Sequence, residues 1–239
     1  MAGETIKTEA ICLDIRPWSR TSHVVSWLTP TGKVSTVVKG AVRAKSQFLG
    51  QYDLNYTCDI VYYARAKGEL HALRECVPVE MREKLRVDYR KLVLAGYFRR
   101  LVAELAPMGE DCRAWYEGLG RSFSCLVPCV SCLVRFELEV LRLSGLAPDF
   151  SKFDKNAEWL AFSLETGAFG SVEGRCIRIS REVAEYLANG AKDAKNSQTP
   201  LDAARVIGVF YQFHLDCASD VRRTVLGMIS SSKEESGRL

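Results

Sequence analysis

The segment "IRPWSRTSHVVSWLTPTGKVSTVVKGAVRAKSQFLGQY", residues 15–52, decides the fold. Its β-branched and aromatic runs "SHVVSWLT" and "VSTVVKG" are separated by the turn sequence "TPTGK", and this pattern predicts two paired strands. Ile11, Leu13 and Ile15 alternate along the chain just before them, which predicts another strand. We therefore expect the segment to lie within β-structure.

Two more strands are predicted beyond this segment. "YDLNYTCDIVYYA" is rich in β-branched and aromatic residues, the turn sequence "RAKGE" follows it, and "LHALREC" completes the run. Five strands between residues 4 and 79, without an intervening helix, predict a small barrel, and five is the strand count of the OB-fold. An SH3-like barrel or a short meander has a similar pattern, so both remain alternatives.

After Pro78 the apolar period changes from two residues to about 3.6, the period of an α-helix. Apolar residues from Leu85 to Leu105 predict one long helix, and more helices are expected near residues 111–126, 129–146, 180–190 and 201–229. Residues 147–178 are rich in glycine and loop-forming residues. We expect an α+β multidomain chain: an OB-fold domain at 1–79 and a helical domain at 80–239, with an irregular or small β insertion at 147–178.

The composition is that of an ordinary soluble globular protein, with 47% hydrophobic and 26% charged residues in 239. The N-terminus lacks an apolar run of signal-peptide length, and no segment offers about 20 consecutive apolar residues, so we expect a cytoplasmic protein. Nine cysteines without a regular framework then favour reduced thiols. No pattern of a catalytic triad, a phosphate-binding glycine loop or a zinc protease is present, so we expect no enzymatic activity.

The opening segment contains six basic residues and no acidic one, although the whole chain has 33 basic and 29 acidic residues. Lys and Arg on a barrel surface neutralise phosphates, and a carboxylate among them would weaken that binding. The pattern therefore predicts a nucleic-acid contact through Arg16, Arg20, Lys33, Lys39, Arg43 and Lys45. A solvated surface is the alternative, because most charge runs are of that kind and the net charge of the chain is only +4.

Aromatic residues are interleaved with these basic residues, and aromatic rings on an OB-fold can stack on bases. Trp18, Trp27, Phe48 and Tyr52 all lie in the segment. Most aromatic residues of a small barrel belong to its core, which is the alternative for each of them. Phe48 and Tyr52 are the better stacking candidates because they lie in an expected loop close to Arg43 and Lys45.

The only CxxC sequence is "CVSC", Cys129 to Cys132. A zinc site needs a second cysteine or histidine pair, and the three histidines of the chain do not cluster in the sequence. A redox CxxC belongs at the strand-to-helix turn of a βαβ unit, which is not predicted here. We therefore expect both cysteines to be core residues and expect no metal ligand or cofactor.

The N-terminal segment, a short strand before it and "LHALREC" after it together resemble the N-terminal domain of the RecO recombination mediators of bacteria. "VVKGAVRAKS" is the most specific part, and "VRFELEVLRLSGLAPDF" is similar to the same family. The resemblance implies an OB-fold, a helical middle and a distal region in a nucleoid-associated protein. It implies binding of single- and double-stranded DNA, annealing of complementary strands, and loading of recombinase with RecR and the single-strand binding protein SSB in RecF-pathway repair.

The sequence departs from this family in the distal region. Many RecO proteins carry two CxxC pairs there, which form a four-cysteine zinc site. In this chain Phe153 and Asn156 stand in "KFDKN" where the first pair is expected, and only Cys176 lies near the second. One cysteine cannot form a four-thiolate site, so we expect no zinc.

The resemblance also implies a docking site for the acidic tail of SSB on the helical domain. It maps to "VRFELEVLRLSG", where Arg135 and Arg142 can meet carboxylates beside an apolar groove. A local ion pair with Glu137 or Glu139 is the alternative for Arg135.

The leading functional prediction is a RecO-like protein that binds and anneals DNA. The alternative is an OB-fold protein that binds RNA or associates with the ribosome, since phosphate contacts do not distinguish DNA from RNA. Binding to an anionic membrane surface is less well supported, because no basic amphipathic helix with an exposed apolar face is predicted.

Overall fold

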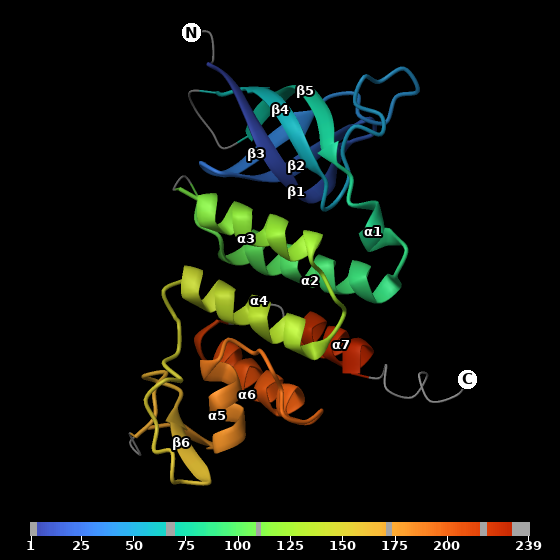
Figure 1. The fold of residues 1–239 in the computed structure, drawn as a ribbon. Coiled ribbons are helices and arrows are strands. Elements are labelled where there is room, and N and C mark those ends of the chain that lie inside the picture. The colour runs from blue at the N-terminus through green and yellow to red at the C-terminus, as the bar shows by residue number, and fades with distance from the viewer. Residues whose placement is uncertain (1–3, 66–69, 109–110, 171–173, 216–218, 231–239) are drawn as a thin grey trace, which may run out of the picture. The chain divides into compact units, whose positions relative to one another are not determined.

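A computed structural model describes residues 4–65, 70–108, 111–170, 174–215 and 219–230. Its contacts divide the chain into two compact units, Met1–Cys125 and Leu126–Leu239. The first unit contains a barrel, drawn in blue to green in Figure 1, and three helices, whereas the second is mainly helical. Within the described residues, none of the helices has the length and hydrophobicity that a membrane crossing requires.

A closed five-stranded barrel forms the start of the first unit. Its strands are β1 Thr5–Ser19, β2 Ser22–Thr29, β3 Gly32–Val38, β4 Thr57–Tyr63 and β5 Leu70–Glu80. They are ordered β1-β2-β3-β5-β4, and β4 pairs back with β1. The parallel pair β3–β5 excludes a meander, in which each strand pairs antiparallel with the next. The predicted OB-fold barrel followed by helices is confirmed.

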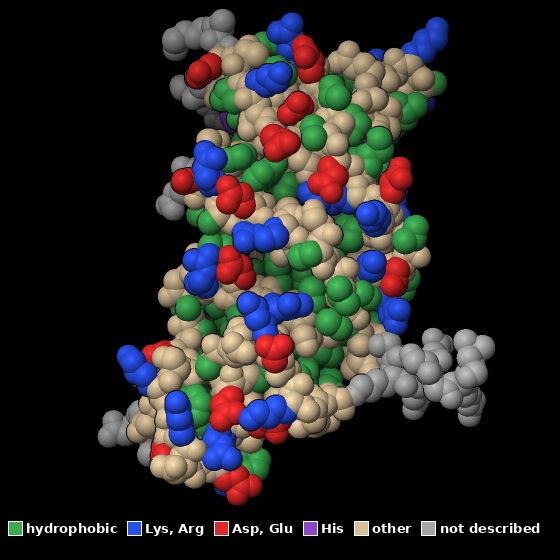
Figure 2. All heavy atoms as spheres, viewed as in Figure 1, with side chains coloured by type: hydrophobic (Ala, Val, Ile, Leu, Met, Phe, Trp, Pro, Cys, Tyr) green, Lys and Arg blue, Asp and Glu red, His purple; other side chains and the backbone are tan. Residues whose placement is uncertain are grey.

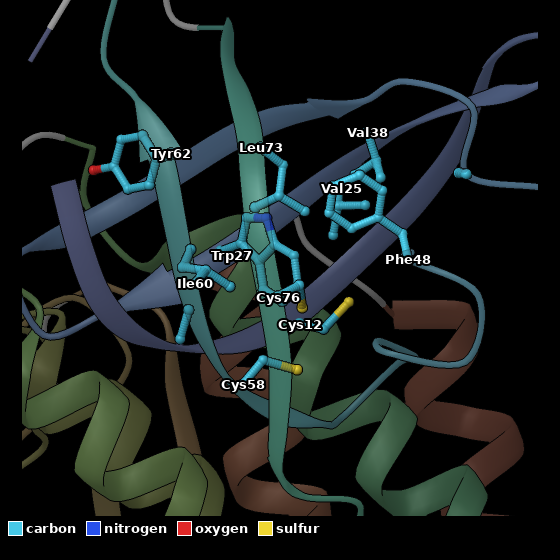
Figure 3. Close-up of a cluster of buried hydrophobic side chains, with 12 residues drawn as sticks. Cys12, Val25, Trp27, Val38, Phe48, Cys58, Ile60, Tyr62, Leu73 and Cys76 are labelled. Carbon is cyan, nitrogen blue, oxygen red and sulfur yellow. The ribbon is translucent and has the colours of Figure 1, made fainter. Parts of the chain in front are cut away.

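The barrel is closed around a core centred on Trp27. Acidic and basic side chains are mixed over the face seen in Figure 2, whereas apolar side chains gather inside the barrel, as Figure 3 shows. Trp27 is fully buried, and its indole N–H donates to Thr36 Oγ1 at 2.9 Å. Cys12, Cys58 and Cys76 are also buried in this core, as is common for cysteines that form no disulfide.

Strand β1 pairs with two neighbouring strands and has two β-bulges. Its first half pairs with β4 and its second half with β2. The register against β2 shifts after Cys12 and again after Pro17, so Leu13 and Trp18 are the extra residues of two β-bulges. The carbonyl of Leu13 accepts a hydrogen bond from the guanidinium of Arg99 instead.

Three helices complete the first unit: α1 Glu83–Arg86, α2 Tyr89–Leu105 and α3 Arg113–Ser124. The prediction of one long helix from Leu85 to Leu105 is wrong in one respect, because the structure has two helices there. Asp88 is the N-cap of the second helix, and its side chain accepts a hydrogen bond from the Arg90 N–H. Helix α2 contacts β1, and α3 contacts β2. The compact unit therefore extends beyond the expected barrel domain of residues 1–79 and includes α1 to α3.

The second unit is built from the helices α4 Val130–Leu143, α5 Arg181–Ala188, α6 Thr199–His214 and α7 Ser219–Ser230. Helix α6 packs against α4, α5 and α7. Glu137 of α4 is fully buried and is held by Arg222 of α7, whose Nε and Nη2 lie 2.7 and 2.9 Å from the two carboxylate oxygens. Burial of a carboxylate is tolerated here because this guanidinium neutralises it and donates hydrogen bonds.

The insertion of the second unit contains a two-stranded antiparallel sheet, formed by β6 Trp159–Ser163 and β7 Cys176–Ser180. Phenylalanine rings pack beside it: the ring centroids of Phe150 and Phe162 are 5.0 Å apart, and those of Phe153 and Phe169 are 5.5 Å apart. Phe153, which stands where the resemblance places a zinc ligand, thus belongs to an aromatic cluster. No group of three metal-ligating side chains occurs among the described residues, and the absence of zinc remains a prediction.

Candidate nucleic-acid interface

Two loops meet at one end of the barrel: the turn between β1 and β2, and the connection between β3 and β4, residues 39–56. The Val42 N–H donates to the Thr21 carbonyl at 3.3 Å, and the Gly40 N–H donates to Ser22 Oγ at 3.3 Å. These bonds join the two loops, so basic residues far apart in the sequence lie on one end. We call this surface the basic end and define it by Arg16, Arg20, Lys39, Arg43 and Lys45.

Gly40 shapes the second loop. Its φ of +67° is a left-handed conformation that glycine adopts without strain, and it lets the Arg43 N–H donate to the Gly40 carbonyl at 3.1 Å. A Cβ atom at this position would lie 3.2 Å from Cδ of Arg43. The glycine therefore allows the Arg43 side chain to lie across the turn.

The five side chains of the basic end are exposed. Figure 2 shows Lys and Arg side chains projecting from the upper right of the barrel, where Figure 1 draws the β3–β4 connection. Arg16 forms an ion pair with Asp14 at 2.5 Å. Within the described ranges of the chain, the other four form no ion pair, so their charges are available to an anionic ligand.

Lys33 does not belong to this surface, and its contact with phosphate stays a prediction that its position does not favour. It lies near the start of β3, whereas the basic end lies beyond the end of that strand. Its half-buried Nζ donates to the Ala103 carbonyl of α2 at 2.9 Å, and burial lowers the pKa of this amine. Lys33 therefore holds α2 against the barrel.

The two aromatic residues favoured by the sequence also lie inside. Phe48 is only 8% exposed and packs in the barrel core, so the prediction that it stacks on bases is wrong. Tyr52 is half-buried: its hydroxyl lies 2.9 Å from His23 Nδ1, its ring meets the edge of Trp27, and burial raises the pKa of its phenol. A base-stacking role of Tyr52 remains a prediction.

Trp18 is the large aromatic residue that the basic end does expose. It is 62% exposed, whereas Trp27 on the neighbouring strand is fully buried. The sequence pattern favoured loop aromatics and passed over Trp18. The available signal was its position between Arg16 and Arg20, just before the turn.

Several basic residues of α1 and α2 are engaged with other groups of the first unit. Arg86 pairs with Asp53 at 2.6 Å, and Arg100 pairs with Glu104 at 2.8 Å. Arg99 donates to the Leu13 carbonyl. These contacts favour a structural role for this helical surface over an extension of the basic end.

The barrel sequence matches a known family. Residues 1–82 match the family model described as the N terminal of recombination protein O. The chain is 30% identical over 149 residues to DNA repair protein RecO of Alkaliphilus metalliredigens (strain QYMF), a match that covers 60% of this chain and 59% of that protein. It is 28% identical over 151 residues to DNA repair protein RecO of Roseiflexus sp. (strain RS-1), covering 62% of this chain and 53% of that protein.

A third relative, DNA repair protein RecO of Clostridium novyi (strain NT), is 27% identical over 152 residues, covering 61% of this chain and 58% of that protein. The N-terminal part of the chain, residues 1–82, is therefore similar to the N-terminal domain of the RecO family. The matched stretches span little more than half the length of these RecO relatives.

The helix that the RecO resemblance assigns to SSB docking is α4. Arg142 makes a two-pronged contact with Glu139, with N–O distances of 2.8 and 2.9 Å, and these bonds raise the pKa of Arg142. Glu137 pairs with Arg222 instead of Arg135. Arg135 is exposed, so the local ion pair considered for it is not observed with either glutamate.

The "CVSC" sequence lies at the start of α4. Cys132 is 8% exposed and belongs to the core, whereas Cys129 is half-buried at the N-cap position. The core prediction is therefore confirmed for Cys132 and is only partly met by Cys129.

Proposed function

We propose that this protein acts in DNA repair and recombination by binding DNA at the basic end. The observation that carries the proposal is that two hydrogen-bonded loops and the end of β1 together expose Arg16, Arg20, Lys39, Arg43 and Lys45. Among the described residues, Asp14 is the one carboxylate that pairs with any of them. Such a cluster attracts phosphates with little dependence on base sequence. The names of the RecO relatives support DNA as the ligand.

The finer activity that we propose is binding of both single- and double-stranded DNA and annealing of complementary strands. Base pairing supplies the free energy of annealing, so the protein needs to screen the repulsion between phosphates and to hold the strands together. The basic end is suited to this task because four of its five cations are not engaged with carboxylates of the described chain. No bond chemistry is required, in keeping with the prediction that the protein is not an enzyme.

We further propose that the protein works with RecR and SSB to load recombinase. Arg135 is the better candidate for a contact with the acidic tail of SSB because its side chain is exposed. Arg142 would first have to leave Glu139, with which it already makes two hydrogen bonds. Charge-assisted hydrogen bonds of this kind are among the stronger ones in proteins.

The test compares the affinity of the full chain for DNA and RNA oligonucleotides of matched sequence, with an annealing assay on complementary DNA strands. We expect salt-dependent binding of DNA and faster annealing in the presence of the protein. Tighter binding of RNA without annealing would favour the RNA- or ribosome-associated alternative, because contacts to the 2′-hydroxyl are what distinguish RNA.

A further inference from the structure

Trp18 occupies an unusual position in the barrel. The residues around it pair as Pro17 with His23 and Ser19 with Ser22, so Trp18 is the extra residue of the second β-bulge in β1. A bulge releases one residue from the ladder and redirects its side chain, and bulges are frequent next to functional sites. This bulge lies directly beside the turn that the basic end uses.

The exposure of Trp18 is not explained by the packing of the barrel. Of the other tryptophans in the same unit, Trp27 is 0% and Trp115 is 5% exposed, whereas Trp18 is 62% exposed. Val42 and Leu49, in the loop that is bonded to the β1–β2 turn, are also exposed at 51% and 59%. A large aromatic ring thus stands in solvent among exposed cations, where an apolar surface otherwise costs free energy.

The chemistry around Trp18 matches a nucleotide with an unpaired base. Arg16 and Arg20 flank it in the chain, and Lys39 and Arg43 come from the loop joined to its turn. Cations can neutralise the phosphates on either side, and an indole ring can stack on any of the four bases. In a duplex both faces of a base are already covered by neighbouring bases, so the same ring finds no stacking partner unless it opens a base step.

We propose that Trp18 stacks on an unpaired base and thereby directs the basic end toward single-stranded nucleic acid. This inference rests on the proposed function and adds the residue that sets the preference for single strands. The phosphate contacts of the basic end supply affinity for either form of DNA, and Trp18 supplies the difference between them.

The test uses the full chain and compares Trp18→Ala and Trp18→Phe with the wild type on a single-stranded oligonucleotide and on the matching duplex. Alanine should weaken single-strand binding about 5- to 150-fold, the range measured for loss of one stacking side chain, and should change duplex binding less than about twofold. Phenylalanine should restore much of the loss. The slope of affinity against salt should stay that of the wild type, because no phosphate contact is removed.

Fluorescence gives a second measurement that does not depend on affinity alone. Trp18 and Trp159 are the two exposed tryptophans, at 62% and 52%, and Trp159 lies in the second unit. In a Trp159→Phe variant, stacking on Trp18 should quench the solvent-exposed emission when single-stranded DNA binds. Trp159→Ala is the matched control and should leave both affinities unchanged. Melting temperatures of all variants verify that they are folded.

Equal weakening of single-strand and duplex binding by Trp18→Ala would overturn the proposal. It would indicate instead that the Trp18 ring inserts between base pairs of duplex DNA. Unchanged single-strand binding and unquenched emission would overturn it altogether. Both results leave the proposed function intact, since the wild type still binds DNA. A wild-type chain that shows no salt-dependent binding of DNA would instead refute the proposed function.

Discussion

Removing the three cations of the β3–β4 connection is the most direct test of the basic end. Lys39, Arg43 and Lys45 are exposed, and none forms an ion pair within the part of the chain that the structure describes. The triple variant Lys39→Ala, Arg43→Ala and Lys45→Ala therefore removes charge without breaking a contact that holds the barrel. Surface changes of this kind usually alter the free energy of unfolding by less than about 0.5 kcal/mol each, so the melting temperature should barely change.

The expected effect on binding follows from counterion release. Each phosphate contact on single-stranded DNA contributes about 0.7 to the slope of log affinity against log salt, so three contacts contribute about two. A slope that is smaller by two means that raising salt fourfold weakens the variant about 15-fold less than it weakens the wild type. Fluorescence anisotropy titrations on two oligonucleotides of different base sequence, over a series of salt concentrations, measure this slope. The loss should be nearly the same for both sequences.

The matched control removes three exposed lysines of the second unit, Lys152, Lys155 and Lys192. It lowers the net charge by the same amount, so it separates a local contact from the general charge of the chain. We expect its slope to stay close to that of the wild type. An unchanged slope in the folded Lys39, Arg43 and Lys45 variant, or an equal change in the control, would mean that the basic end is only a solvated surface.

Three further predictions concern other parts of the molecule. Arg135→Ala should weaken binding of an SSB-tail peptide by about 1.5 to 3 kcal/mol, measured by calorimetry, and Arg142→Ala should weaken it less because Arg142 is engaged by Glu139; equal losses would contradict this ranking. Phe48→Ala should lower the free energy of unfolding by about 3 to 5 kcal/mol in a denaturant titration, since Phe48 is a core residue, whereas a stable variant with lost DNA binding would restore its stacking role. A chelator should leave the melting temperature of the purified chain unchanged, and a clear drop would reveal a structural metal.

The types of the secondary-structure elements were predictable because they follow from local periodicity. The run "SHVVSWLT" became β2, and the five predicted strands closed into the predicted barrel. The predicted long helix is interrupted because the Asp88 side chain accepts a hydrogen bond from the Arg90 N–H. This side-chain bond competes with the backbone bonds of a continuous helix, and the spacing of apolar residues gives no sign of it. Local patterns thus gave the elements and left their ends uncertain.

The composition of the candidate site was less predictable because it depends on contacts distant in sequence. Lys33 bonds to a carbonyl 70 residues away, so it does not belong to the basic end. Phe48 enters the core only because the β3–β4 connection folds back over the barrel, and Trp18 is exposed by a bulge that depends on pairing with another strand. Neither the fold-back nor the register is encoded in the neighbours of these residues.

The contacts of Arg82 indicate which fragment of this protein can fold by itself. It lies just beyond the predicted end of the barrel domain, yet its buried guanidinium donates to the Asn55 carbonyl at 2.9 Å and to Thr57 Oγ1 at 2.7 Å, and it stacks over Phe123 of α3. A fragment that stops at Val79 would lose these bonds together with the carbonyl that holds Lys33. The barrel is therefore not a transplantable module by itself. A fragment that is to be transferred to another protein has to include α1 to α3, up to Cys125.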